Sequence, residues 1–489
     1  MDKLDRRQFL QTTLTAAASA ALLPACSPLR GSRPAHQRVV GANSDIRYAI
    51  VGVNGRGYDH VRGMSIVRGT RLVALCDVDR QVLDRETKKT ADRGLQVQGY
   101  SDMRRMLEVE DLDAVFLATP NHWHSLGAIW AIQAGKDVYV EKPVSHNVWE
   151  GRQLVNVTRK YQRIVQTGTQ CRSACGIAEG IQWLREGHIG KILRARGLCY
   201  KSRPSIGKTV APQTIPPGVD YDLWCGPAPR EPLMRKRLHY DWHWVWPTGN
   251  GDIGNQGVHQ MDLARWALGE TGLAPRVWSV GGRLGYEDDG RTPNTLVTFH
   301  DYPAAPLIFE VRGLPTRTGV DELDTYRGAS VGLVVDCEAG SMVVPDYEQA
   351  NFFDQAGKPI KTFQGSFSHY ENFIAAMRSH RHTDLKADIL EGHISSALCH
   401  LSNLSYLMGR PHTPEEIREA VKAKPDLAEA IGRMEQHLAA NQVDLLKSPA
   451  TLGEVLSLDL KTERFPDNPA ANRLLTREYR APFVMPEKV

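Results

Sequence analysis

A glycine-rich hexapeptide restricts the fold of this chain more than any other feature. Gly52-Val53-Asn54-Gly55-Arg56-Gly57 follows an apolar strand pattern at Arg47–Val53 and leads into a helical pattern. Glycines allow a tight bend between a strand and a helix, and they let backbone N–H groups approach a phosphate closely. Asn54 stands where such turns usually have their middle glycine. We expect a dinucleotide pyrophosphate to bind at Gly52, Asn54, Gly55, Arg56 and Gly57.

Strand and helix patterns alternate after this turn. Strands are predicted at Arg71–Cys76, near Gln96–Tyr100, at Ala114–Ala118 and ending at Tyr139–Lys142, and helices at Arg80–Asp92, Ser101–Leu107 and His122–Ala134. This alternation predicts an α/β fold with a doubly wound parallel sheet, the Rossmann fold, over residues 45–165.

An acidic residue follows the second predicted strand. Asp77 lies 20 residues beyond Gly57. A carboxylate at this place accepts hydrogen bonds from the adenosine ribose hydroxyls and repels a 2′-phosphate, so we expect NAD rather than NADP as the cofactor. The alternative is that Asp77 merely caps the end of its strand.

A lysine ends another buried strand. In the stretch Asp137–Asn147, apolar residues lead directly into Glu141, Lys142 and Pro143. Open α/β sheets bind ligands at the carboxyl ends of their strands, and an ammonium group there can donate hydrogen bonds to a substrate hydroxyl or exchange a proton. Pro143 is a candidate for a cis peptide bond. The alternative is a solvated Lys-Pro turn.

Length and charge narrow the possible classes of protein. A chain of 489 residues is too long for one ordinary domain, so two are expected. The formal net charge is +4 and the basic residues are scattered, which argues against a nucleic-acid partner. No CxxC motif or histidine cluster accompanies the cysteines, so we expect neither a disulfide framework nor a metal site.

The first 26 residues are typical of an export signal. A twin-arginine core, Asp5–Leu10, precedes an apolar run from Leu10 to Leu23. Cys26 follows Leu23-Pro24-Ala25 and is a candidate lipid-anchored residue, with plain cleavage nearby as the alternative. We therefore expect a periplasmic or cell-envelope protein, and a polar linker at Ser27–Ser44.

Several tryptophans gather near the middle of the chain. Trp224, Trp242, Trp244 and Trp246 fall within 23 residues, next to a glycine-rich loop. Flat amphipathic rings suit the C–H faces of sugars, which favours a carbohydrate cleft containing Trp244, although single tryptophans more often pack in a core.

These motifs together resemble the glucose–fructose oxidoreductase, inositol dehydrogenase and MocA (Gfo/Idh/MocA) family. The resemblance is carried by Gly52–Gly57, by Ala118–Asn121 with His124, and by Glu141–Pro143. It implies that Thr119, Pro120 and Asn121 lie beside the nicotinamide ribose, that Glu141 faces the cofactor and that Lys142 reaches the substrate. For His124, packing at the start of a helix and ligand contact are both open.

The resemblance also implies a second domain at residues 166–410, of α+β type with an open, mostly antiparallel sheet, followed by an extension at 411–489. Strand patterns at Arg276–Leu284, Asn294–Tyr302, Pro306–Val311 and Val331–Cys337 support it. In this family a residue near Arg172 often faces the active site, and dimers or tetramers are common.

The family's Asp-x-Gly-x-His pattern falls on Asn255 and His259. The histidine is the expected general base, because an imidazole titrates near neutral pH. Asn255 departs from the pattern, since an amide cannot stabilise an imidazolium as a carboxylate does. Three alternatives follow from this departure. Asp252 or Asp262 takes the place of the missing carboxylate, Lys142 carries more of the proton transfer, or the enzyme catalyses a different reaction. A structural histidine at the start of a helix is the remaining alternative.

An exported enzyme has no soluble NAD pool, so the cofactor must be held tightly and regenerated in place. We expect a sugar oxidoreductase of this kind. The second interpretation is a redox-neutral NAD-dependent glycoside hydrolase. Such an enzyme oxidises a sugar hydroxyl, eliminates the glycosidic substituent, adds water and returns the hydride. A sugar-binding protein with a vestigial cofactor site is the third.

Overall fold

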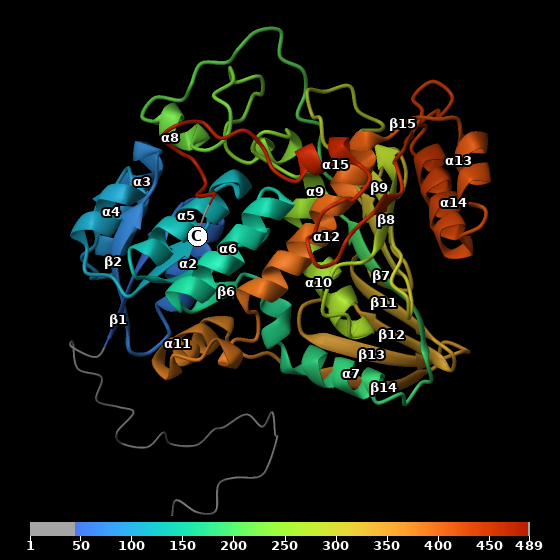
Figure 1. Cartoon of the computed structure of the whole chain (residues 1–489), viewed down its shortest axis with the longest axis horizontal. Coiled ribbons are helices and arrows are strands. Elements are labelled where there is room, and N and C mark those ends of the chain that lie inside the picture. The colour runs from blue at the N-terminus through green and yellow to red at the C-terminus, as the bar shows by residue number, and fades with distance from the viewer. Residues whose placement is uncertain (1–44, 488–489) are drawn as a thin grey trace, which may run out of the picture. The chain divides into compact units, whose positions relative to one another are not determined.

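The computed structural model describes residues 45–487 (Figure 1). The predicted export segment and linker lie outside these residues. The first domain contains a parallel sheet of order β3-β2-β1-β4-β5-β6. Its strands are β1 (Ile46–Val51), β2 (Thr70–Cys76), β3 (Gln98–Tyr100), β4 (Ala114–Leu117), β5 (Asp137–Val140) and β6 (Val165–Thr167). The doubly wound sheet predicted from the sequence is confirmed.

Helices cover both faces of this sheet. They are α2 (Arg56–Met64), α3 (Arg80–Ala91), α4 (Met103–Val109), α5 (Asn121–Gln133) and α6 (Val148–Tyr161). Apolar side chains of α4, α5 and α6 form one core with the sheet, and those of α2 and α3 form another, which α11 (His369–Ser379) completes from the distant part of the chain. The strand order reverses between β1 and β4, and ligands of such sheets bind where the carboxyl ends of these strands diverge.

The second domain is built on a large mixed sheet. The order within the described residues is β14-β13-β12-β11-β7-β10-β9-β8-β16-β15, with β17 also paired to β8; β7 and β10 run parallel and the other neighbours antiparallel. The bounds are β7 (Ile192–Tyr200), β8 (Arg276–Gly282), β9 (Thr295–His300), β10 (Leu307–Arg312), β11 (Val331–Cys337), β12 (Gly340–Val344), β13 (Gln349–Asp354), β14 (Pro359–Gln364), β15 (Arg410–Pro411), β16 (Thr451–Leu452) and β17 (Leu456–Ser457).

One face of the large sheet carries the main core of this domain. Helices α7 (Cys175–Arg185), α10 (Gly257–Leu268) and α12 (Ile389–Met408) pack there through a continuous apolar cluster (Figure 1). Helix α12 also contacts α6, so it joins the two domains. The remaining helical segments are η2 (Gln170–Ser173), α8 (Tyr221–Cys225), η3 (Asp241–Trp244), α9 (Gly251–Asn255), η4 (His382–Asp384), α13 (Pro414–Val421), α14 (Pro425–Ala440) and α15 (Pro469–Leu474).

The C-terminal extension packs against both domains. Helices α13 and α14 cover the second face of β8, β9 and β10, and β16 and β17 extend the sheet itself. Further on, Phe483 and Met485 are buried in the core formed by α4, α5 and α6. None of the described helices is long and apolar enough to cross a membrane.

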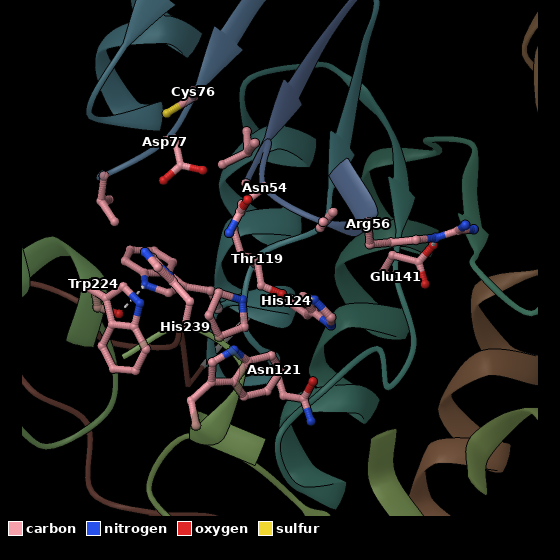
Figure 2. A pocket seen from close by; sticks show the side chains of 18 of the residues that line it. Asn54, Arg56, Cys76, Asp77, Thr119, Asn121, His124, Glu141, Trp224 and His239 are labelled. Carbon is pink, nitrogen blue, oxygen red and sulfur yellow. Dashed lines mark hydrogen bonds and ion pairs between the residues drawn. The ribbon is translucent and has the colours of Figure 1, made fainter. Parts of the chain in front are cut away.

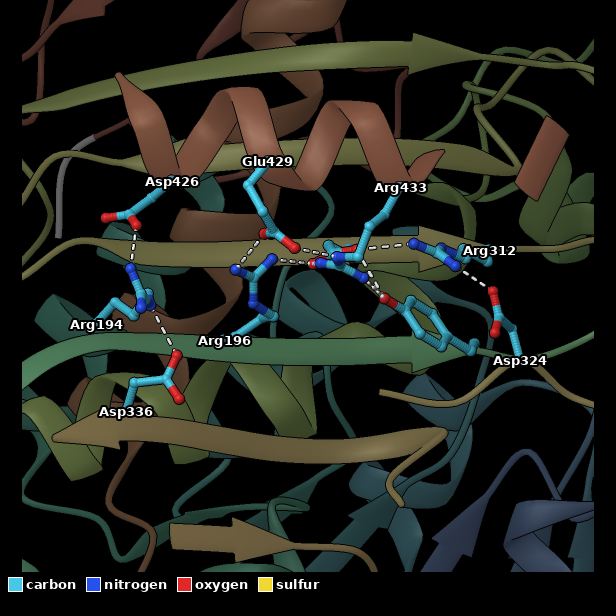
Figure 3. A network of polar contacts seen from close by, with 10 residues as sticks. Arg194, Arg196, Arg312, Asp324, Asp336, Asp426, Glu429 and Arg433 are labelled. Atoms are coloured by element: carbon cyan, nitrogen blue, oxygen red, sulfur yellow. Dashed lines mark hydrogen bonds and ion pairs between the residues drawn. The ribbon is translucent and has the colours of Figure 1, made fainter. Parts of the chain in front are cut away.

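A buried polar network fixes α14 to the sheet (Figure 3). Glu310 on β10 is 1% exposed and contacts Arg196 on β7 and Arg433 on α14. It also accepts a hydrogen bond from Tyr200 at 2.7 Å. Burial alone would raise the pKa of Glu310, but Arg196 and Arg433 outweigh it and hold the pKa below its ordinary value. The carboxylate is therefore the buried counter-charge of Arg196 and Arg433, both of which also pair with the more exposed Glu429.

Replacing Glu310 with glutamine is expected to destabilise the protein by about 3–5 kcal/mol, because the buried guanidinium of Arg196 loses its only buried counter-charge among the described residues and keeps only the more exposed Glu429. Glu429 on α14 provides the matched control: it also pairs with Arg196, but its side chain is 44% exposed, so Glu429→Gln should cost about 1 kcal/mol or less. Denaturant unfolding at pH 7 measures both. Equal losses for the two variants would contradict this account of the network.

Candidate functional site

The turn between β1 and α2 has the geometry that the glycine motif predicts. Gly52 has φ 80°, and α2 begins at Arg56 after Gly55, with no side chain capping its N-terminus. A Cβ atom on Gly57 would lie 1.8 Å from the carbonyl oxygen of Gly52, so no other residue fits there. An uncapped helix N-terminus behind a tight glycine turn can receive the phosphates of a nucleotide.

Asp77 is held at the end of β2 by the backbone around it. One carboxylate oxygen accepts a hydrogen bond from the N–H of Val53 at 2.9 Å, and the other accepts one from Asp79 at 3.0 Å. Burial raises the pKa of Asp77, and the two hydrogen bonds, which lower it, only partly offset this effect. The group is thereby aimed into the same cavity as the glycine turn, where Figure 2 shows it beside Asn54.

The loop after β4 forms the next wall of the cavity. Thr119, Pro120 and Asn121 line it, and the Asn121 amide donates to Asn250 Oδ1 at 3.0 Å. His124 is buried, and its ring nitrogens contact the carbonyl oxygens of Thr119 at 2.7 Å and Pro143 at 2.6 Å. It therefore ties the loop after β4 to the loop after β5, and it also lines the cavity.

Glu141 and Lys142 lie together at the end of β5 but make different contacts. Glu141 accepts a hydrogen bond from Arg56 Nε at 2.8 Å; burial would raise its pKa, but Arg56 and His60 outweigh it and hold the pKa well below the ordinary range. Lys142 Nζ donates to the carbonyl oxygen of Asn255 at 2.6 Å, and burial lowers its pKa. The Lys142–Pro143 bond is cis, as the sequence suggested.

A long irregular segment between β7 and α9 covers this cavity. Its residues Leu223, Trp224, His239, Tyr240, Trp242 and His243 complete the lining of a space of about 390 Å³. Figure 2 shows Trp224 and His239 among the side chains that line the cavity. The segment is tied to the Rossmann domain by hydrogen bonds from Asp220 N to Val78 O and from Arg80 N to Gly218 O, each 3.0 Å. Apart from the tryptophans, no sequence pattern pointed to these residues.

His259 is not among the residues that line the cavity of Lys142. His259 lies in the first turn of α10, buried, with its ring centroid 5.3 Å from that of Tyr347. Its Nδ1 has no hydrogen-bond partner among the described residues. Burial and the charge of Lys142 lower its pKa to about 3, so its ring is neutral and still electrostatically coupled to the lysine.

The other predicted substrate residues also lie outside this cavity lining. Arg172 donates to Asp262 at 2.7 and 2.9 Å and to Glu391 at 2.9 Å, so Arg172 and Asp262 neutralise each other. Asp252 accepts from Arg203 Nη2 at 2.9 Å. The predictions that Asp252 or Asp262 assists His259 find no support, because both carboxylates are already paired with arginines.

Trp244 is buried and does not line this cavity. It is 2% exposed, and the guanidinium carbons of Arg203 and Arg283 lie 5.7 and 5.8 Å from its ring centroid. Its neighbours Trp242 and Trp224 line the cavity instead. The tryptophan cluster is thus divided between cavity wall and core.

Two regions of the chain match known protein domains. Residues 46–169 match the domain described as oxidoreductase family, NAD-binding Rossmann fold, and residues 188–290 match the oxidoreductase family, C-terminal alpha/beta domain. Both domains belong to the Gfo/Idh/MocA family. The N-terminal match spans the glycine turn, Asp77 and the Glu141-Lys142-Pro143 motif, which are the features that form the cavity.

Curated relatives of this chain include proteins named as glycosyl hydrolases. Glycosyl hydrolase family 109 protein 2 of Shewanella sp. (strain ANA-3) is 34% identical over 176 residues, which are 33% of this chain and 39% of that protein. The glycosyl hydrolase family 109 protein of Saccharopolyspora erythraea is 27% identical over 263 residues, covering 51% and 52%. The chain thus matches about two fifths to one half of the length of these relatives.

Solved structures share the fold over both domains. The WlbA dehydrogenase from Bordetella pertussis, in complex with NADH and UDP-GlcNAcA, has a TM-score of 0.55 and 19% identity, covering 73% of this chain and 94% of that one. A levoglucosan dehydrogenase in complex with NADH and levoglucosan has a TM-score of 0.56 and 16% identity, covering 73% and 96%. At these identities the likeness establishes the fold.

Proposed function

We propose that this protein is an NAD-dependent oxidoreductase that acts on a sugar or sugar derivative by hydride transfer. One observation carries the proposal: a single cavity joins the glycine turn and Asp77 at one end to Lys142 at the other. The first two groups fit the phosphates and the adenosine ribose of a dinucleotide, which leaves the lysine for the nicotinamide end. The sugars bound by the dehydrogenase neighbours support the substrate class.

The residues around the cavity would have different roles in such a reaction. Bound NAD would supply the hydride acceptor. The Lys142 ammonium would donate a hydrogen bond to the reacting hydroxyl and stabilise the developing alkoxide, and the neutral ring of His259 would accept the hydroxyl proton as hydride leaves the same carbon. Trp224, Trp242 and Tyr240 would exclude water from the cavity, because they close the side away from the parallel sheet.

The covering segment also supports a tightly held cofactor. Arg480, near the C-terminus, donates to the side chain and the carbonyl of Asp222 at 2.7 and 2.8 Å, and so fastens the segment from outside. Release of a nucleotide would require this segment to move. A cofactor that stays bound would be regenerated in place, by returning its hydride to a second sugar or to the product.

A second function is favoured by the curated relatives, which are named as glycosyl hydrolases. In a redox-neutral hydrolase the same cavity would oxidise a sugar hydroxyl, allow elimination of the glycosidic substituent, add water and return the hydride. The Glu141-Lys142-Pro143 motif, which such glycosidases tend to lack, leads us to prefer the oxidoreductase.

One experiment separates these functions. The purified protein is denatured and the released nucleotide identified, and the native protein is then incubated with free sugars and glycosides while absorbance and NMR spectra are followed. Ketosugar or lactone formation with reduction of the bound nucleotide supports the oxidoreductase, and free sugar released without net redox change supports the hydrolase. Absence of product with any compound would leave a sugar-binding protein with a vestigial cofactor site.

We further propose NAD rather than NADP, because the Asp77 carboxylate would repel a 2′-phosphate. Protein purified from cells should therefore release NAD(H). Asp77→Ser should lower the amount of NAD(H) retained by about tenfold, through loss of charge-assisted hydrogen bonds, and should admit NADP(H). Chromatography of the released nucleotides measures both amounts. NADP(H) released from the unaltered protein would contradict the assignment.

Export by the twin-arginine route, a lipid anchor at Cys26 and a dimeric or tetrameric assembly also remain proposals. The sequence at Asp5–Leu10 supports export, and a retained cofactor would suit a compartment without soluble NAD.

A further inference from the structure

A strap formed by residues 477–485 crosses the outside of the covering segment. Figure 1 shows it in red, passing from α15 to α8 and on to the helices of the Rossmann domain. Two of its side chains, Phe483 and Met485, are 1% and 2% exposed and pack in the core that α4, α5 and α6 form with the parallel sheet. The strap is therefore anchored in the domain whose glycine turn and Asp77 line the cavity.

Two arginines of the strap bind the covering segment directly, at two separate places. Arg480 donates to the Asp222 carboxylate at 2.7 Å and to the Asp222 carbonyl at 2.8 Å. Arg477 donates to the carbonyl of Pro247 at 2.9 Å, and at 3.3 Å to that of His122, which lies on α5. Arg477 thus connects the covering segment to the Rossmann domain.

The strap also supports a residue that holds the covering segment from the side of the Rossmann domain. Trp123 of α5 packs against Phe483, with ring centroids 5.5 Å apart. Its indole N–H donates to the carbonyls of Leu223 at 3.0 Å and Trp224 at 3.2 Å. A Cβ atom on Gly226 would lie 2.3 Å from the Trp123 ring, so the backbone of the covering segment lies directly against this ring. Trp123, Leu223 and Trp224 all line the cavity as well.

A second attachment of the covering segment is made largely by its backbone. Asp79 and Val219 form an isolated antiparallel bridge beside the end of β2, and the backbone hydrogen bonds from Asp220 to Val78 and from Arg80 to Gly218 flank this bridge. A short backbone pairing of this kind can serve as a hinge. The contacts made by the strap are side-chain contacts, which can separate while the hinge stays in place.

We propose that the strap controls the release of the nucleotide, with Arg477, Arg480 and Phe483 as positioning residues that hold the covering segment against the Rossmann domain. The inference rests on the proposed function, which assigns the cavity to a nucleotide. It adds that retention is set from outside the cavity, by side chains that line no part of it. Weakening the strap should turn a protein that keeps its nucleotide into one that exchanges it with the solution.

The experiment measures nucleotide exchange in the whole chain. Protein saturated with NAD is mixed with an excess of isotopically labelled NAD, and the label bound per chain is followed with time. Arg480→Leu removes both hydrogen bonds to Asp222 and should speed exchange by about fivefold or more, a modest factor because the pair is partly exposed. Arg480→Lys, which can still pair with the carboxylate, should give an intermediate rate.

Phe483→Ala weakens the anchor of the strap and has a matched control in the same C-terminal extension. Phe465 is also 1% exposed, but it packs in the main core of the second domain. Both alanine variants should have lower melting temperatures, because each leaves a cavity in a core. Only Phe483→Ala should speed exchange, by about tenfold or more. Hydrogen–deuterium exchange of the backbone amides at residues 218–226 should likewise rise in Phe483→Ala and Arg480→Leu, and not in Phe465→Ala.

Unchanged exchange in both Arg480→Leu and Phe483→Ala would overturn the role of the strap. Equal acceleration by Phe465→Ala would also overturn it, since retention would then follow overall stability. If Phe483→Ala does not fold, the Arg480 variants still decide the question. None of these measurements needs a sugar, so failure to find hydride transfer would reject the proposed function without rejecting the strap. A protein that binds no NAD would contradict both.

Discussion

Lys142→Met is expected to lower the rate of hydride transfer by about 10³-fold or more while the nucleotide stays bound. Methionine fills nearly the same volume as lysine but has no group that can donate to a hydroxyl or stabilise an alkoxide. The nucleotide should remain, because its phosphates and adenosine ribose would be bound by the glycine turn and Asp77, at the other end of the cavity. Single-turnover reduction of the bound nucleotide by a sugar measures the rate.

The control for this substitution is Lys201→Met. The charge of Lys201 also acts on Lys142, and Lys201 Nζ contacts Gln256 Oε1 at 3.4 Å, but Lys201 lines a separate hollow beside Tyr347. We expect it to change the rate by much less. If the Lys142→Met enzyme kept its activity, the role assigned to the lysine would be wrong, whichever sugar is the substrate.

Gly57→Ala is expected to abolish nucleotide binding. Its Cβ would lie 1.8 Å from the carbonyl oxygen of Gly52, a distance that no rotation of a side chain relieves, because both groups belong to the backbone of the turn. The turn would have to open, and the backbone N–H groups at the start of α2 would no longer converge on a phosphate. We expect nucleotide retention to fall by about 100-fold or more, measured as nucleotide released per protein chain.

Gly432→Ala in α14 is the matched control for this substitution. No atom lies within 4 Å of the position its Cβ would take, and alanine favours a helix, so folding and nucleotide content should be preserved or slightly improved. A melting temperature for each variant separates loss of the site from loss of the fold. A folded Gly57→Ala protein that still carries a full complement of nucleotide would exclude this turn as the phosphate site.

The Rossmann domain could be predicted because its signals are local. Each strand that ends at the cavity is a short apolar run, and Gly52, Gly57, Asp77 and Lys142 follow these runs directly in the sequence. Parallel strands bring such ends to one edge of a sheet, so the sequence order alone places these residues near one another.

The cover of the cavity could not be predicted in the same way. His239 and Tyr240 lie in a segment without a hydrophobic period, and its position depends on long-range contacts such as that of His239 with Asp79, which is 160 positions away. The role of Asn255 was hidden for a related reason. A spacing pattern links it to His259 on the next helix, whereas in three dimensions its backbone carbonyl accepts a hydrogen bond from Lys142.

Arg172 and Asp262 show how the residue type alone can mislead. A charged side chain near a predicted site suggests substrate contact, but Arg172 pairs with Glu391, which is 219 positions away in the sequence. Such a partner can be recognised only when α12 has been placed against α10. The same holds for Asp252, whose partner Arg203 belongs to the covering segment.

The most direct test of this account is a crystal structure of the protein with its nucleotide bound. We predict the pyrophosphate at Gly52–Gly57, the adenosine ribose on Asp77, and the nicotinamide ring beside Lys142, beneath Tyr240 and Trp242. A nucleotide bound elsewhere, or one whose nicotinamide points away from Lys142, would contradict the proposal that this cavity carries out hydride transfer.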